Sequence, residues 1–172
     1  ETGTRDLRRL SGLARFMPIT ATLAMVAAAA MAGVPLLNGF LSKEMFLAEA
    51  LEAHSGTILD AALPILATLA SAFSVFYSIR FIHQAFFGPP PVDLPHSPHE
   101  APHWMRFPIE ILVLACLLVG ILPGLTIGPL LAHAVGAVLG EHAPAYSLAV
   151  WHGFNQPLLM SLIALVGGAL AY

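Results

Sequence analysis

Long apolar runs, interrupted by glycine and proline, are the feature that most restricts how this chain can fold. At a rise of about 1.5 Å per residue, a helix from Phe16 to Ala32 crosses most of a hydrocarbon core. Hydrophobic residues make up 58% of the 172 residues and charged residues 10%, whereas soluble domains average about 25% charged residues. We therefore predict an all-α integral membrane helix bundle.

The first apolar run is interrupted and then resumes. Gly33-Val34-Pro35 breaks the helical pattern, because proline lacks a backbone donor, clashes one turn back and disfavours helix in the residue before it. Gly39 follows, and the run then continues to about Glu52. We interpret residues 16–53 as one discontinuous transmembrane helix with Gly33, Pro35 and Gly39 at the break. A tight helical hairpin over the same residues is the alternative.

Proline- and glycine-rich stretches divide the rest of the chain. Gly88-Pro89-Pro90-Pro91 ends one span, and Pro108 suits the first turn of the next, which we expect to extend back into Trp104 and Met105. The apolar stretch 130–139 is too short to cross and suggests a re-entrant or interfacial piece. The predicted segments are a basic cytoplasmic segment at 1–15, the discontinuous helix at 16–53, a transmembrane helix at 58–87, a cytoplasmic Pro/His loop at 88–107, a transmembrane helix at 108–124, an external or interfacial segment at 125–156, and a truncated transmembrane helix at 157–172.

The arginines predict the orientation of these spans. Four of them precede the first span, Arg80 and Arg106 flank the 88–107 loop, and the connections at 51–58 and 124–156 contain none. The positive-inside rule places residues 1–15 and 88–107 on the cytoplasmic side. This alternation is consistent if 16–53 crosses once, whereas a hairpin would put the basic ends on opposite sides. The arginine pattern therefore favours the broken helix.

Lys43 is the only lysine, and it follows the predicted break directly. A charged side chain at the centre of a bilayer costs roughly 2.5–3.5 kcal/mol on insertion scales, so such residues commonly mark ion or proton pathways. A lysine partly shielded from water beside a broken helix is suited to load and release a proton. Glu44 points about 100° away around a helix and is not its facing partner. The alternative is that Lys43 reaches the interface and only anchors its helix.

Arg80 and His83 lie one turn apart on the same face of the next predicted helix. Histidine titrates near neutral pH, so the pair is a candidate proton path beside Lys43 and Glu44. The alternative is a cytoplasmic anchor with an interfacial imidazole, and the sequence alone leaves both open.

Histidines also cluster in the 88–107 loop, but their spacing fits no zinc pattern. Two prolines among them prevent a helical clamp of ligands, so we predict a solvated loop without a metal. Phosphate loops, nucleophile elbows and thiolate clusters are absent from the sequence, and the net charge of −3 gives no footprint for nucleic acid. We predict no cofactor, and a transport function in place of an enzymatic one. The clustered residues are His96, His99, Glu100 and His103.

Several strings resemble one family when they are taken together. They are the strings at 3–13, 17–18 and 31–35, and Asn38-Gly39-Phe40-Leu41-Ser42-Lys43-Glu44. They are similar to the proton-conducting antiporter-like subunits shared by respiratory complex I and the Mrp-type multisubunit cation/proton antiporters. The resemblance implies that the motif lies on a discontinuous helix and that Lys43 is the terminal protonatable group of a half-channel. Arg80 matches a family arginine whose role is less direct.

Other residues favour the Mrp branch of this family. Glu44 stands where relatives in complex I usually carry aspartate, and the strings 99–102 and 148–155 resemble the large A subunit of Mrp antiporters. The resemblance implies a multi-pass subunit of the bacterial cell membrane that works with other membrane subunits to exchange protons for Na⁺ or another monovalent cation. The rivals are a proton-pumping subunit of NADH:quinone oxidoreductase and a passive assembly subunit. Because the chain lacks an initiator Met and its last apolar run stops at Tyr172, we expect it to be part of a longer protein.

Overall fold

The described part of the chain folds into helices of very different lengths. The structure, a computed structural model, describes residues 1–52, 56, 59–140, 148 and 153–172. Within these residues every regular element is a helix. In chain order they are η1 (Leu13–Arg15), α1 (Pro18–Ala32), α2 (Asn38–Glu52), α3 (Leu59–Phe86), α4 (His103–Ile121), α5 (Pro123–Thr126), α6 (Gly128–Leu139) and α7 (Gln156–Leu170).

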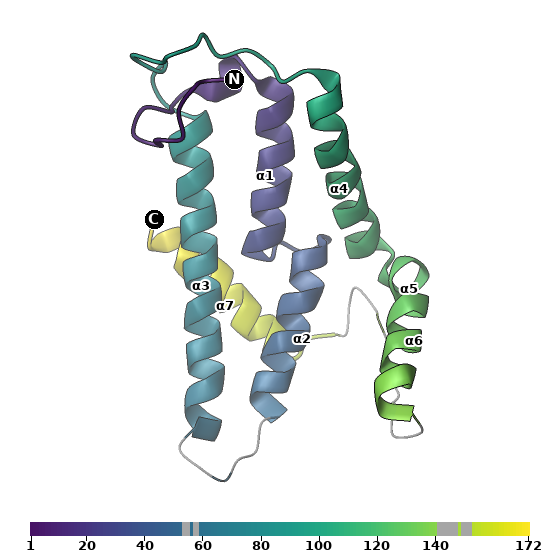
Figure 1. Cartoon of the computed structure of the whole chain (residues 1–172). Coiled ribbons are helices and arrows are strands. Elements are labelled where there is room, and N and C mark those ends of the chain that lie inside the picture. Colours follow the sequence, from purple (N-terminus) through teal and green to yellow (C-terminus); the bar gives the residue numbers. More distant parts are fainter. Residues whose placement is uncertain (53–55, 57–58, 141–147, 149–152) are drawn as a thin grey trace.

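Helices α1 and α2 follow one another along the length of α3 (Figure 1). Both run in the same direction, α1 beside the C-terminal half of α3 and α2 beside its N-terminal half, with residues 33–37 forming the connection between them. The pair thus has the shape of one interrupted helix. α3 passes through Pro64 without ending, so the pair of short helices is packed against one continuous helix.

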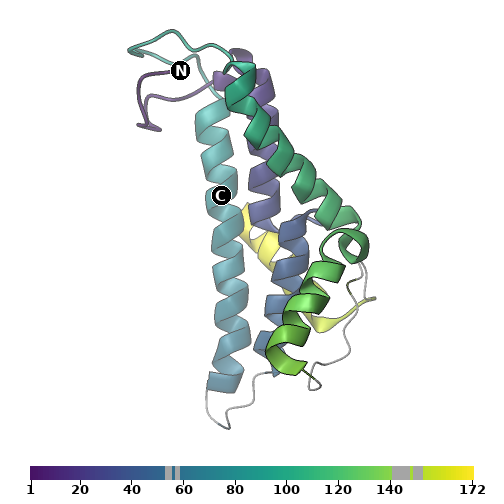
Figure 2. The same cartoon turned by 45° about the vertical axis from the view of Figure 1, so that its right-hand side comes forward.

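Helix α7 crosses α3 diagonally and begins beside α2 (Figures 1 and 2). The crossing is close at Gly168, where an added Cβ would lie 2.4 Å from the Ala72 carbonyl oxygen and 2.6 Å from Val75 Cβ. Only glycine permits this approach. α7 is therefore held tightly on α3, with its N-terminal end against the α2 half of the interrupted pair.

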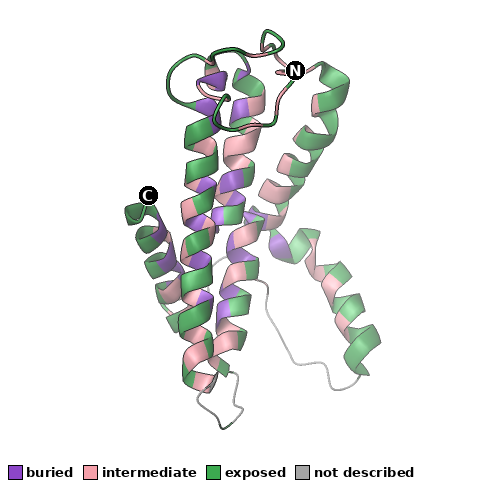
Figure 3. Cartoon of the chain, turned by 60° about the vertical axis from the view of Figure 1, so that its left-hand side comes forward, coloured by how far each residue is buried: buried purple, intermediate pink, exposed green. Residues whose placement is uncertain are grey.

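Helix α4 lies on the outer side of α1 and α2, and α5 and α6 extend from its end (Figure 2). Figure 3 shows buried positions concentrated on the inner helices; Gly120 is the one buried residue of α4, and α6 has none. α4 begins at His103, so the predicted 88–107 loop extends too far, and Pro108 lies inside α4. The part of the 125–156 segment at 141–147 and 149–152 lies outside the described residues.

Two of the described helices are long and apolar enough to cross a membrane by length and composition, the part of α3 from Asp60 to Phe86 and α4. α1, α6 and α7 are shorter apolar helices. The predicted all-helical class agrees with this architecture.

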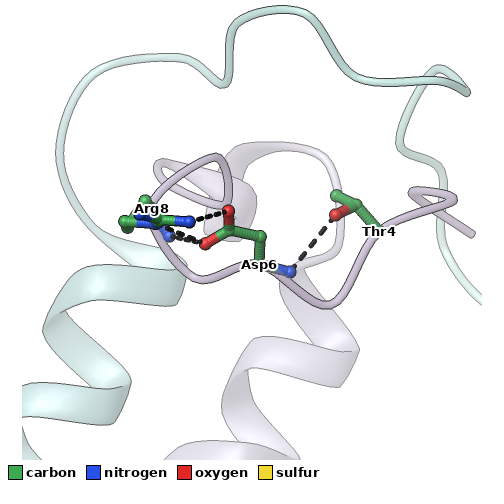
Figure 4. A network of polar contacts seen from close by, with 3 residues as sticks. All are labelled: Thr4, Asp6 and Arg8. Carbon is green, nitrogen blue, oxygen red and sulfur yellow. Dashed lines mark hydrogen bonds and ion pairs between the residues drawn. The ribbon is translucent and has the colours of Figure 1, made fainter.

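The N-terminal segment is shaped by a local network around Asp6 (Figure 4). The Asp6 carboxylate accepts hydrogen bonds from Arg8 Nε at 3.0 Å and Arg8 Nη2 at 2.9 Å, and the Asp6 amide donates to Thr4 Oγ1 at 3.2 Å. The hydrogen bond from the Arg8 guanidinium is the main cause that lowers the pKa of the Asp6 carboxyl. Asp6 thus neutralises part of the positive charge of the basic segment before the first span.

Candidate functional site

The break between α1 and α2 is a defined backbone structure. Gly33 has φ 79°, in the left-handed region, and its amide donates to the Ala30 carbonyl at 3.0 Å, while the Val34 amide donates to the Ala29 carbonyl at 3.0 Å. This pair of bonds with glycine in that position is a Schellman motif. α1 therefore ends by a standard helix stop in which glycine is the preferred residue.

A turn over residues 34–37 then redirects the chain into α2. The Leu37 amide donates to the Val34 carbonyl at 3.3 Å, Pro35 holds the second position, and Leu36 has φ 70°. Proline followed by a residue of positive φ is the combination found in type II turns. At the start of α2, an added Cβ on Gly39 would lie 1.8 Å from the Ala30 carbonyl oxygen, so α2 begins directly against α1.

The two carbonyls of the last turn of α1 that the Schellman motif leaves open are satisfied by side chains from other helices. Ser74 Oγ of α3 donates to the Met31 carbonyl at 2.9 Å. Lys43 Nζ of α2 donates to the Ala32 carbonyl at 2.8 Å. The last four carbonyls of a helix lack partners within it and need them elsewhere when water is excluded. All four carbonyls of Ala29 to Ala32 have one here.

Lys43 reaches this carbonyl over Gly33. Side chains on a helix lean toward its N-terminus, which directs the Lys43 stem back to the break. An added Cβ on Gly33 would lie 2.6 Å from Lys43 Cδ, so the missing side chain makes room for the stem. The Lys43 side chain is half-buried, and its amine lies at the negative end of the α1 dipole, which favours a cation. Lys43 thus occupies a partly shielded position at the end of an interrupted helix.

Glu44 lies on a different side of α2 and contacts α7. It is buried, with 7% of its surface exposed, and its Oε1 atom accepts a hydrogen bond from Asn155 Nδ2 at 3.2 Å. Asn155 is the N-cap of α7, and its Oδ1 atom accepts from the Leu158 amide at 2.9 Å. Asn155 has no predicted site role in the sequence, although Asn-Gln-Pro before an apolar run is a recognisable helix start.

Helix α4 covers the break from the other side. Cys116 Sγ donates to Asn38 Oδ1 at 2.9 Å, and an added Cβ on Gly120, one turn further on, would lie 2.3 Å from the Leu36 carbonyl oxygen. The backbone of α4 therefore touches the backbone of the 34–37 turn. Neither residue carries a sequence signal for this role, because the contacts join segments about eighty residues apart.

The structure places Arg80 and His83 near the C-terminal end of α3, beside residues 7–11, and not in contact with Lys43. Arg80 is exposed and forms no ion pair among the described residues. His83 Nδ1 is hydrogen-bonded to the Tyr172 hydroxyl, and their rings meet edge to face. His83 and Ala32 do line one apolar groove of about 450 Å³ between α1, α3 and α7. The groove therefore extends from the break to the end of α3, and Lys43 is not among its lining residues.

In the predicted 88–107 loop, His99, Glu100 and His103 each contact a different partner. His99 pairs with Glu1 at 2.6 Å, and His103 stacks on Phe107. Glu100 accepts from the Ile19 amide at 2.9 Å, the Thr20 amide at 3.2 Å and the Thr20 hydroxyl. Burial raises the pKa of the Glu100 carboxyl, but these hydrogen bonds and Arg106 outweigh it, so the net pKa is lowered. Glu100 therefore caps the start of α1 from a distant loop.

Comparison with known proteins gives the family of the chain. A model of the transmembrane family described as NADH:quinone oxidoreductase/Mrp antiporter matches residues 1–69, which include the break and Lys43. The solved structure of the Mrp complex from Dietzia sp. DQ12-45-1b matches 98% of this chain with a TM-score of 0.78 and 35% identity. The chain belongs to this family of antiporter-like membrane subunits.

Two relatives from bacteria match the chain over nearly its full length. A protein of Rhizobium meliloti (strain 1021), named as the probable A/B subunit of a K⁺/H⁺ antiporter, is 67% identical over 168 residues, or 98% of this chain and 17% of the relative. The putative antiporter subunit mnhA2 of Staphylococcus saprophyticus is 38% identical over 179 residues, or 98% of this chain and 22% of the relative. This antiporter-like chain thus spans about a fifth of the length of these relatives, and it covers 18% of the matched chain in the Dietzia structure.

These matches confirm the predicted family and all-helical class. They also identify the chain as part of a multi-pass membrane protein whose relatives are named as transporter subunits and not as enzymes. Of the 148–155 string that favours the Mrp branch, Trp151 and His152 lie outside the described residues, whereas Asn155 lies at the start of α7.

Proposed function

We propose that this chain is a portion of the A subunit of an Mrp-type antiporter of the bacterial cell membrane, in which Lys43 carries a proton through the membrane. The observation that carries the proposal is the hydrogen bond from Lys43 Nζ to the Ala32 carbonyl at 2.8 Å, at the end of an interrupted helix. The names of the relatives support the antiporter assignment. Other membrane subunits and the lipid bilayer are the expected partners.

The geometry at Lys43 suits a group that changes protonation. A lysine amine keeps N–H donors in both its charged and its neutral form, so it can hold the Ala32 carbonyl in either state. The α1 dipole favours the ammonium, whereas partial exclusion of water favours the neutral amine. These opposed effects allow the proton to be taken up and given away. Inward proton movement would then drive monovalent cations outward.

The exchanged cation is a separate question. One relative is named as part of a K⁺/H⁺ antiporter, whereas others are named as parts of Na⁺/H⁺ antiporters. The higher identity of the K⁺-named relative makes K⁺ a cation to be tested beside Na⁺. No described residue is assigned to cation binding, and the chain spans only about a fifth of the length of these relatives.

The test uses the complete multisubunit complex in everted membrane vesicles that carry an imposed pH gradient and no electron donor. Wild-type vesicles should collapse the gradient when Na⁺ or K⁺ is added. Lys43→Ala and Lys43→Arg should assemble normally but lower the rate by about a hundredfold, the usual cost of losing a positioned proton-transfer group. Arginine supplies a donor for Ala32 but does not release its proton at working pH.

Two results would contradict the proposal. Full antiport by Lys43→Arg would reduce Lys43 to an anchor of the helix end, as in a passive subunit. A wild-type complex that moves protons only with NADH and quinone would favour the second candidate, a pumping subunit of NADH:quinone oxidoreductase, because the family description covers both classes. Ser42→Ala is a matched control, since Ser42 is exposed and its hydroxyl donates within its own turn, to the Gly39 carbonyl at 3.2 Å.

A further inference from the structure

Asn155 holds two helices through one side chain. Its Oδ1 atom accepts from the Leu158 amide of α7, and its Nδ2 group donates to Glu44 of α2. Because the cap fixes which end of the amide faces α7, the donor end is left to face Glu44. The carboxylate and the amide are therefore matched as acceptor and donor, across 111 positions of sequence.

The α7 end of this contact is supported by the packing of α7 against its neighbours. Gly168 packs α7 against Ala72 and Val75 of α3 without space for a Cβ, and α3 is a single continuous helix. Figure 1 shows the start of α7 beside α2. Leu158, whose amide bonds to Asn155, is buried as well, so the packing of α7 begins next to Asn155.

The α2 end of the contact is next to the proposed proton carrier. Glu44 is buried and directly follows Lys43, whose side chain projects about 100° away around the helix. Fixing Glu44 therefore fixes how α2 is rotated about its axis. That rotation decides whether Lys43 Nζ reaches the Ala32 carbonyl, since its stem passes over Gly33 with no spare room.

We propose that Asn155 is a positioning residue for Lys43, acting through Glu44 to set the rotation of α2 relative to α1. This inference rests on the proposed proton-carrying role of Lys43 and adds α7 to the transport machinery. Asn155 and Glu44 form a rotational stop for α2 that keeps the amine at the break.

Substitutions at position 155 can separate the N-cap of α7 from the contact with Glu44. Serine caps helices about as well as asparagine but has no amide donor, so Asn155→Ser should retain α7 and lose the Glu44 contact. We expect a maximal antiport rate lowered by about tenfold, the scale of one hydrogen bond to a charged group, with an unchanged half-saturating cation concentration. Gln156→Ala, at the exposed neighbouring position, should behave as wild type.

A role-swapped pair provides the decisive measurement. Asn155→Asp keeps the cap and places a carboxylate against Glu44, so it should lower both the antiport rate and the thermal midpoint of the assembled complex. Adding Glu44→Gln restores the hydrogen bond in the reverse direction, because the glutamine amide at position 44 can donate to the aspartate carboxylate at position 155. The double variant should recover most of both losses. Such recovery requires that the hydrogen bond between positions 44 and 155 itself contributes to the antiport rate and to stability.

Three outcomes bear on this proposal. Full activity of Asn155→Ser, or a double variant whose losses equal the sum of the two single losses, overturns it. An Asn155→Ser complex that changes cation half-saturation and leaves the maximal rate intact also overturns it. Failure of the proposed function is distinguishable, because it appears as full antiport in Lys43→Arg while the stability coupling between positions 44 and 155 is measured without any transport.

Discussion

Lys43 Nζ donates a 2.8 Å hydrogen bond to the carbonyl of Ala32, the last residue of α1, from the second turn of α2. The same group is therefore a helix cap and the candidate proton carrier. An interrupted helix inside a membrane leaves carbonyls that must find donors, because lipid supplies none. In this chain the protonatable residue is one of those donors, so the break and the proposed chemistry depend on each other.

Gly33→Ala should disturb both the end of α1 and the position of the Lys43 side chain. The new Cβ would lie 2.6 Å from Lys43 Cδ, and alanine at φ 79° carries a left-handed strain of about 1–2 kcal/mol. We expect a lower thermal midpoint of the purified complex and a large loss of antiport. Gly167→Ala in α7 is the control, since its added Cβ meets nothing within 4 Å. An unchanged Gly33→Ala complex would show that the Lys43 stem does not need this space.

Ser74→Ala should destabilise the break without touching Lys43. The Met31 carbonyl loses its partner from α3, and a backbone carbonyl without a donor costs several kcal/mol inside a bilayer, because lipid supplies none. We expect a lower thermal midpoint, with antiport at moderate temperature reduced much less than by Lys43→Ala. Thermal unfolding of the complex in detergent measures this difference. A midpoint equal to that of wild type would mean that water or another group replaces the hydroxyl.

Gly120→Ala tests whether α4 supports the turn at 34–37. The added Cβ would lie 2.3 Å from the Leu36 carbonyl oxygen, so α4 or the turn must move. On propensity alone, alanine in a helix is favoured over glycine by about 1 kcal/mol. A loss of stability in Gly120→Ala would therefore mean that the clash with the Leu36 carbonyl outweighs the higher helix propensity of alanine. Gly136→Ala in α6 is the control: nothing lies within 4 Å of its new Cβ, so it should be neutral or stabilising. The same result for Gly120→Ala would show that α4 does not support the turn at 34–37.

Local patterns in the sequence predict the helices but not the contacts that surround Lys43. The stop after Ala32 follows from Gly33 and Pro35, which act on their own neighbours in the chain. Ser74 and Asn155 contact the interrupted helix from far along the sequence, and neither residue is unusual where it stands. Trp104 and Met105 lie in the first turn of α4, as the expected backward extension of this span requires, whereas the expected place of Pro108 in the first turn is wrong, because α4 begins at His103 and accommodates Pro108 further in. The roles of Arg80 and His83 stay predictions, since both lie away from Lys43 in the structure.

Glu100→Gln should lower stability in a pH-dependent way. The carboxylate caps the α1 amides of Ile19 and Thr20, and the net lowering of its pKa in the folded protein means that folding favours the ionised form. This contribution is present above the unfolded pKa of about 4.3 and is lost as the pH falls through the lower folded pKa. The thermal midpoint of Glu100→Gln should lie below wild type at pH 7, and the two should converge in acid. A constant difference across this range would assign the effect to packing, and Asp93→Asn, at an exposed position of the same loop, is the control.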